Sequence, residues 1–89
     1  MIKTKITIIN KLGLHARAAA KLISVTSPFR AQIRIGANGR LIDAKSIMSV
    51  MMLAAGKDTE LDLECDGDDE QSAHDAVIAL INNRFDEAE

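Results

Sequence analysis

The chain has 89 residues, of which 47% are hydrophobic and 27% charged, a balance that indicates a soluble globular protein. Two phenylalanines are its only aromatic residues, so the core must be aliphatic and no aromatic platform is available for stacking nucleic-acid bases. The formal net charge of −2 gives a nucleic-acid partner little support, and the single cysteine excludes an internal disulfide. No apolar run approaches the length of a membrane span. We therefore expect one cytoplasmic domain over residues 1–89, with no nucleic-acid partner and no membrane insertion.

The first half of the chain predicts three strands and one helix. Apolar and polar residues alternate over 2–8, which is typical of a half-buried strand. Residues 16–27 carry apolar side chains at helical spacing, and a proline follows them. A second alternating strand covers 31–35. Asn38-Gly39 then indicates a two-residue hairpin, because both turn positions need positive φ, and 40–43 is expected to be a short edge strand.

The second half predicts two helices and one strand. Ser46 is expected to cap a short apolar helix over 47–55 that Gly56 terminates. A strand follows over 61–65. The last helix carries a regularly spaced apolar stripe, namely Ala73, Ala76, Val77, Leu80 and Ile81. The acidic tail, 85–89, is expected to fray. This βαββαβα order predicts an α+β, two-layer open-faced sandwich, a four-stranded antiparallel sheet with three helices on one face.

The segment Gly13-Leu14-His15-Ala16-Arg17 lies where the first strand gives way to the first helix. A helix starting near residue 16 makes His15 its N-cap, with the free backbone amides of Ala16, Arg17 and Ala18 directed towards the imidazole. The positive helix end and the Arg17 guanidinium disfavour imidazolium, so we expect a neutral, nucleophilic His15. The same groups would attract a phosphoryl group attached to it, and Gly13 would let the backbone approach a partner closely. The alternative is a histidine that only caps a helix beside a solvated arginine.

Two stretches resemble signature segments of one known family. Residues 13–20, Gly-Leu-His-Ala-Arg-Ala-Ala-Ala, are similar to the active-site segment of the HPr family of the bacterial phosphotransferase system. Residues 45–53 are similar to that family's regulatory serine segment, and the predicted element order matches end to end. The resemblance implies that enzyme I phosphorylates His15 on Nδ1, that Arg17 stabilises the phosphoryl group and that a IIA protein or domain receives it. It also implies possible phosphorylation of Ser46 by an HPr kinase/phosphorylase.

The chain departs from the family pattern at two places. Ala18 stands where most members carry proline, and it retains a backbone amide that proline would lack. One more hydrogen-bond donor is therefore expected near His15. Ser24, Ser27 and Ser49 stand where several members carry lysines. Electrostatic steering towards an acidic enzyme I is expected to be weaker in consequence.

The short helix after Ser46 contains Met48, Met51 and Met52. A short helix with so little polar surface cannot bury every face, so at least one methionine should be exposed beside His15. We expect Ile47, Met48 and Met51 to form an adaptable docking surface for several partners.

Other polar residues suggest no further chemistry. His74 has no second ligand at metal spacing and is expected on a solvated helix surface. The acidic run 66–70 lacks the spacing of a calcium loop and is better explained by the dipole of the following helix. Cys65 is expected to be a small buried residue. We expect no metal site and no cofactor.

Three classes of function remain to be compared. The first is a monomeric phosphocarrier, either HPr of the sugar branch, favoured by the Ser46 segment, or NPr of the nitrogen-related branch, whose acidic tails the end of this chain resembles. The second is a small regulatory interaction module without phosphoryl transfer. The third, a stand-alone enzyme, is disfavoured because the sequence offers no set of nucleophile, base and orienting residue.

Overall fold

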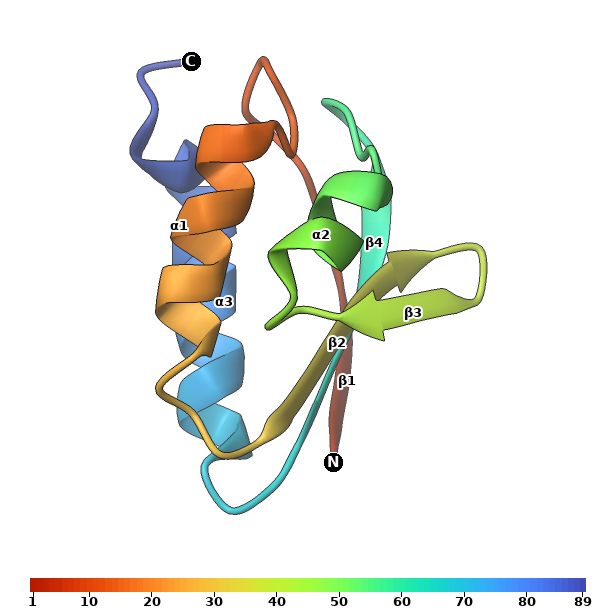
Figure 1. Ribbon diagram of the computed structural model, residues 1–89, viewed down its shortest axis with the longest axis vertical. Coiled ribbons are helices and arrows are strands. Elements are labelled where there is room, and N and C mark those ends of the chain that lie inside the picture. The colour runs from red at the N-terminus through yellow and green to blue at the C-terminus, as the bar shows by residue number, and fades with distance from the viewer.

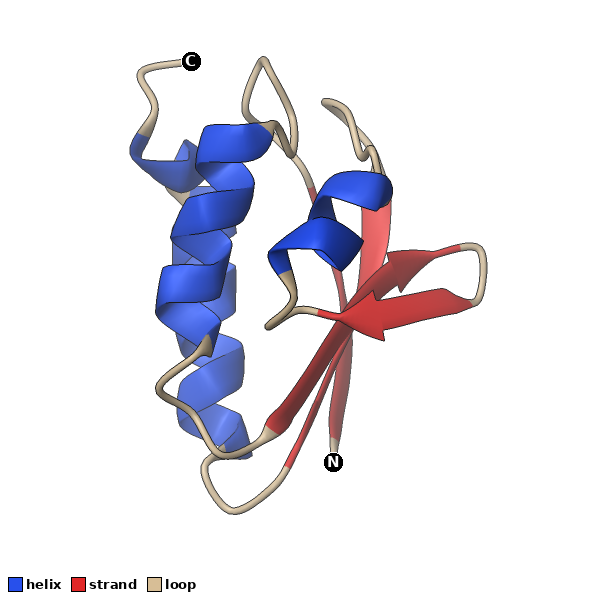
Figure 2. Cartoon of the chain, in the orientation of Figure 1, coloured by secondary structure: helices blue, strands red, loops and turns tan.

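The chain folds into a four-stranded antiparallel sheet with its helices on one face, as the sequence predicts (Figures 1 and 2). The computed structural model describes residues 1–89. Its elements are β1 (Ile2–Thr7), α1 (Ala16–Thr26), β2 (Gln32–Ala37), β3 (Arg40–Asp43), α2 (Ile47–Met52), β4 (Glu60–Asp66) and α3 (Glu70–Asn82), followed by a 3-10 turn, Arg84–Asp86. None of the helices is long and apolar enough to cross a bilayer.

The strands pair in the order β1-β4-β2-β3. Strand β4 lies between β1 and β2, with Thr4 opposite Leu63 on one side and Ile35 opposite Leu63 on the other. Strand β3 is an edge strand, as expected. It joins β2 through Asn38-Gly39, and both residues have the positive φ that the hairpin turn requires, 56° and 79°.

The core is aliphatic and lies between the sheet and the helices. Alternate side chains of β2 and β4 are buried, and Cys65 lies among them as predicted. The same burial raises the pKa of the Cys65 thiol, which makes it an inert packing residue. Helix α3 buries the predicted stripe, except that Ala76 is only half-buried.

Helix α2 ends earlier than the sequence predicts. It stops at Met52, and the left-handed residue behind it is Ala54, with φ of 52°, so the prediction that Gly56 terminates the helix is wrong. The amide of Leu14 donates to the carbonyl of Ala55 at 2.8 Å. This contact joins the segment after α2 to the loop before α1.

The C-terminal tail is ordered, which corrects the expectation that it frays. Phe85 is fully buried in the core, and Lys21 Nζ donates to its carbonyl at 2.9 Å. Arg84, Phe85 and Asp86 all have φ between 52° and 63°, a left-handed turn without any glycine. The turn reverses the chain after α3 and brings the tail alongside the N-terminal end of α1 (Figure 1).

Two polar side chains outside the tail also differ from expectation. His74 is not solvated: its side chain is 15% exposed and its Nε2 lies 3.0 Å from the Thr4 hydroxyl of β1. Asp69 precedes α3 but makes no capping bond to it. Its carboxylate instead accepts from the amides of Arg30 and Ala31, at 2.9 and 2.8 Å, and these bonds lower the pKa of Asp69.

We predict that Phe85→Ala lowers the free energy of unfolding by about 3–5 kcal/mol, because it removes a fully buried aromatic ring from a packed core. Denaturant unfolding measures this loss. Glu89→Ala, a change at the exposed end of the same tail, should leave stability nearly unchanged. A loss under about 1 kcal/mol for Phe85→Ala would mean that the tail frays after all.

Candidate functional site

His15 occupies the N-cap of α1. Its backbone is extended, with φ of −76° and ψ of 177°, and its carbonyl accepts the first helical bond from Ala19 at 2.8 Å. The amides of Ala16, Arg17 and Ala18 therefore precede the helical ladder and have no carbonyl acceptor within the chain. The His15 side chain makes no capping bond and is 28% exposed. The structure thus places a reachable imidazole beside three free amides.

The loop before His15 is fixed from within the protein. Asn10 is fully buried, and its Nδ2 donates to the carbonyl of Gly13 at 2.8 Å. Gly13 has φ of +66°, and a Cβ there would lie 2.5 Å from the carbonyl oxygen of Ala55. Gly13 is therefore needed for contact with the chain's own loop, which corrects the expectation that it serves the approach of a partner.

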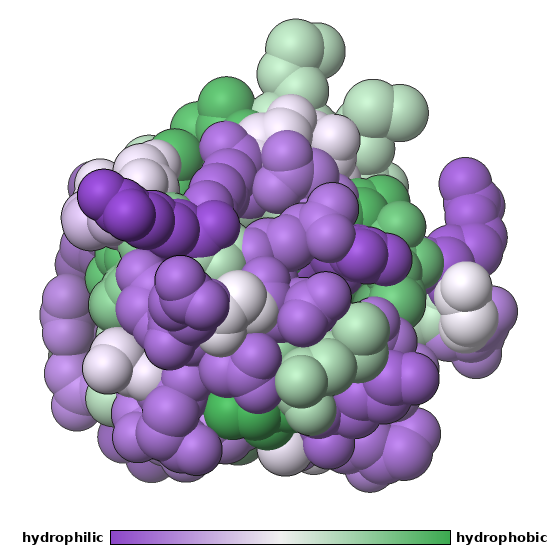
Figure 3. Space-filling view, turned by 90° about the horizontal axis from the view of Figure 1, so that it is seen from below, coloured by the Kyte–Doolittle hydropathy of each residue, from purple (hydrophilic) through white to green (hydrophobic).

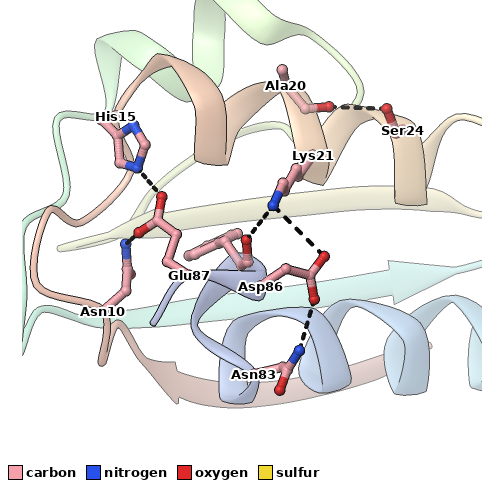
Figure 4. A network of polar contacts seen from close by, with 9 residues as sticks. Asn10, His15, Ala20, Lys21, Ser24, Asn83, Asp86 and Glu87 are labelled. Carbon is pink, nitrogen blue, oxygen red and sulfur yellow. Dashed lines mark hydrogen bonds and ion pairs between the residues drawn. The ribbon is translucent and has the colours of Figure 1, made fainter. Parts of the chain in front are cut away.

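Glu87 from the tail contacts the imidazole directly (Figure 4). Its Oε2 is hydrogen-bonded to Nε2 of His15, and its Oε1 accepts from Asn10 Nδ2 at 2.9 Å. The Glu87 side chain is only 15% exposed. Burial alone would raise the pKa of Glu87, but the hydrogen bonds with Asn10 and His15 and the charges of His15 and Lys21 lower it below its ordinary value. The carboxylate therefore stays ionised beside His15.

Basic residues surround the imidazole in a shallow pocket formed with the tail. Lys11, Arg17 and Lys21 line this pocket. Lys11 Nζ lies 3.5 Å from the Glu89 carboxylate, and Lys21 Nζ lies 3.8 Å from that of Asp86 (Figure 4 shows the Lys21 contacts). Arg17 is exposed and makes neither an ion pair nor a side-chain hydrogen bond. It is thus the cation of the pocket that is free to meet an incoming anion.

Exposed apolar side chains gather next to this pocket. Five of the six large exposed apolar residues lie in the loop before His15 or in α2, namely Leu12, Ile47, Met48, Met51 and Met52. Met48 is 70% exposed and Met52 81%, so the prediction of an exposed methionine in this helix is confirmed. The opposite end of the molecule, seen in Figure 3, is mostly hydrophilic. We name these five residues the apolar patch.

Ser46 caps α2 as predicted, since its hydroxyl accepts from the amide of Ser49 at 3.3 Å. It lies at the start of α2, while the contact between Leu14 and Ala55 lies just beyond the end of that helix. Ser46 therefore lies outside the His15 pocket. It caps α2, the helix that carries four of the five residues of the apolar patch.

The site contains the residues predicted from the segment around His15 and two further residues, Asn10 and Glu87, that the sequence analysis did not predict. His15 and Arg17 line one pocket, and the amides of Ala16, Arg17 and Ala18 are free at the N-terminus of α1. Asn10 and Glu87 were not predicted, because only the fold places Glu87 beside a histidine 72 positions earlier in the chain. The acidic composition of the tail is the one local signal there, and by itself it predicts fraying.

Comparison with known proteins identifies the family. Residues 2–83 match the family model described as the PTS HPr component phosphorylation site. The chain is 58% identical to the phosphocarrier protein HPr of Cupriavidus necator over 89 residues, all of both chains. It is also 58% identical to HPr of Pseudomonas aeruginosa over 86 residues, 96% of each chain. HPr-C-His from Thermoanaerobacter tengcongensis superposes with a TM-score of 0.95 at 38% identity, covering all of both chains.

Two further relatives bear on the alternatives. The phosphocarrier protein NPr of Shewanella violacea is 41% identical over 87 residues, 98% of this chain and 96% of its own. An HPr dimer from Thermoanaerobacter tengcongensis superposes with a TM-score of 0.76 at 39% identity, over 98% of this chain and 100% of its own. Since a dimer occurs among relatives with this fold, the expectation that this chain is a monomer stays a prediction.

We predict that lowering the pH reduces the stability of the wild-type protein more than that of the Glu87→Gln variant. The pKa of Glu87 lies below its ordinary value of 4.5 in the folded protein, so its contribution to stability is complete above about pH 4.5 and is lost as the pH falls through the folded pKa. Melting temperatures measured in steps from pH 6 to pH 3 should show a steeper fall for the wild type. Parallel curves for the two proteins would contradict the Glu87 contacts.

Proposed function

The chain belongs to the PTS HPr family, and on that premise we propose that it is a phosphocarrier that accepts a phosphoryl group on His15 from phosphorylated enzyme I and passes it to a IIA protein or domain. The observation that carries this proposal is the partly exposed imidazole at the N-terminus of α1, beside free amides and an unpaired Arg17. The protein is then an intermediate in a relay rather than a stand-alone enzyme.

The chemistry needs a nucleophilic nitrogen and a receptor for phosphate. The lone pair of one His15 ring nitrogen forms the new bond to phosphorus, and the bond from phosphorus to the donor's phosphorylated atom breaks with its electron pair returning to the donor. Amides at a helix N-terminus stabilise the phosphoryl oxygens of the transition state and of the product. In this role we place the amides of Ala16, Arg17 and Ala18. The Arg17 guanidinium adds charge-assisted hydrogen bonds to the phosphoryl oxygens.

We assign this chain to HPr rather than NPr. In support, the HPr relatives from Cupriavidus necator and Pseudomonas aeruginosa are 58% identical, against 41% for the NPr relative. The residues 45–53, which resemble the regulatory serine segment, favour the same choice.

The apolar patch is the surface we propose for docking both enzyme I and the IIA partner. It contains the predicted Ile47, Met48 and Met51, together with Leu12 and Met52, which the sequence analysis did not assign to the docking surface. Methionine side chains are flexible and polarizable, so they can repack against several partner surfaces. A carrier must contact at least two different proteins with the same site.

We predict that phosphoenolpyruvate and enzyme I produce an acid-labile, base-stable phosphate on the wild-type protein and on His74→Ala, but none on His15→Ala. His74 is the matched control because it is the other histidine of the chain and lies on α3, away from the pocket. Phosphate retained on His15→Ala would show that the site is wrong. A wild-type protein that takes no phosphate would favour the regulatory interaction module.

We also propose that phosphorylation of Ser46, by an HPr kinase/phosphorylase where one is present, weakens docking of enzyme I by charge repulsion. The modification adds up to about two negative charges next to the apolar patch while leaving the cap position favourable for phosphate. Binding should therefore weaken without loss of the fold.

Ser46→Asp tests this switch with one added charge. We expect a lower affinity for enzyme I that recovers partly in high salt, with the melting temperature unchanged or raised. Ser46→Asn is the neutral control, since asparagine also caps helices well. Equal affinities for the two variants would leave Ser46 as a helix cap only.

A further inference from the structure

The two ring nitrogens of His15 have different surroundings. Nε2 is hydrogen-bonded to the Glu87 carboxylate, whereas Nδ1 has no hydrogen-bond partner in the chain. Figure 4 shows the second nitrogen pointing away from Glu87. A carboxylate only accepts hydrogen bonds, so the ring proton of a neutral His15 must lie on Nε2. The lone pair is then on Nδ1.

The tail is built in a way that holds Glu87 at this position. Phe85 is buried two residues earlier and anchors the turn, and the carbonyl of Phe85 is bonded to Lys21 of α1. Asn83 Nδ2 donates to the Asp86 carboxylate at 2.7 Å, which closes the left-handed turn. On the other side of Glu87, Glu89 accepts from the Lys11 amide. Contacts on both sides therefore restrict where the Glu87 side chain can lie.

Asn10 fixes the orientation of the carboxylate itself. Its Nδ2 has two acceptors, the carbonyl of Gly13 and Oε1 of Glu87. A flipped amide would place its oxygen against both acceptors, so the surroundings require Nδ2 to face them. With Oε1 held by Asn10, Oε2 faces Nε2.

We propose that Glu87 is a positioning residue for phosphoryl transfer: it holds the ring proton on Nε2 so that Nδ1 is the nitrogen that attacks phosphorus. The proposal rests on the proposed function of His15. A carboxylate that holds a histidine in one tautomer and orientation has the same role in hydrolytic triads, and one that binds a metal-ligating histidine fixes its tautomer too.

The step balances without any proton transfer. The Nδ1 lone pair forms the bond to phosphorus, and the bond between phosphorus and the donor's phosphorylated atom breaks with its electron pair remaining on that donor atom. The ring proton stays on Nε2 throughout. The positive charge that develops on the ring is stabilised by the adjacent Glu87 carboxylate, and transfer onward to an acceptor is the same step in reverse.

Glu87→Gln in the full chain tests the proposal, because a glutamine amide keeps the size but can donate as well as accept. Two quantities are measured: the tautomer of His15, from the 15N chemical shifts of its ring nitrogens, and the rate of phosphorylation by enzyme I and phosphoenolpyruvate. We expect the wild type to carry the proton on Nε2, the variant to populate both tautomers, and its transfer rate to fall at least about tenfold.

Glu60→Gln is the matched control, a carboxylate of the same size that contacts Lys5 on the sheet and does not line the His15 pocket. It should retain the wild-type tautomer and rate. Glu87→Asp keeps the charge on a side chain one methylene shorter and should retain the Nε2–H tautomer with an intermediate rate. A purely structural role would change the melting temperature of these variants without moving the ring shifts.

Three results would overturn the proposal: a wild-type His15 that carries its proton on Nδ1, a Glu87→Gln variant with unchanged tautomer and rate, or a variant that transfers faster. Faster transfer by the variant would show that Glu87 slows the attack of His15 on phosphorus. A wild-type protein that accepts no phosphate fails the proposed function instead, and the ring shifts would still report separately whether Glu87 holds Nε2.

Discussion

The buried amide of Asn10 joins the two segments on which the site depends. One hydrogen bond fixes the carbonyl of Gly13 in the loop before His15, and the other fixes the carboxylate of Glu87 in the tail. The Gly13 carbonyl lies in the loop that leads into His15, and the Glu87 carboxylate is hydrogen-bonded to the imidazole. Asn10 therefore holds the loop, the histidine and the tail as one unit. Because Asn10 is fully buried, loss of its side chain would also leave these two acceptors without a donor in a place that water reaches poorly.

The parts of the site that the sequence predicts are those whose signals are local. A histidine directly before a run of apolar residues at helical spacing identifies an N-cap, and the free amides follow from helix geometry alone. Ser46 was predictable for the same reason. The alternation of apolar and polar residues in β2 and β4 and the apolar stripe of α3 are also local patterns. Together they predict which faces of the sheet and of the helix pack against each other. The exposed methionines followed from a short helix with too few polar residues to face solvent.

What the sequence did not reveal depends on contacts between distant segments or on uncommon backbone conformations. Ala54, Arg84, Phe85 and Asp86 have positive φ without being glycine, and such residues give no turn signal. Left-handed geometry costs roughly 1–2 kcal/mol per residue, so a tail of this composition is expected to fray unless tertiary contacts compensate. Here the burial of Phe85 and the bond from Lys21 provide them. Just beyond the early end of α2, Ala55 likewise accepts a hydrogen bond from a distant segment, since its donor is the amide of Leu14.

A phosphocarrier must release its phosphoryl group as readily as it receives it, and the composition of the pocket suits that requirement. Every 1.4 kcal/mol of extra stabilisation of the phosphorylated form would slow its release about tenfold. An exposed cation such as Arg17 contributes only about 0–1 kcal/mol, and Lys11 and Lys21 are already engaged with tail carboxylates. In the transfer that we propose, the Glu87 charge opposes a tightly held dianion and stabilises the cationic ring. The balance between one free cation, three free amides and one half-buried carboxylate therefore favours a site that both accepts and donates over one that stores phosphate.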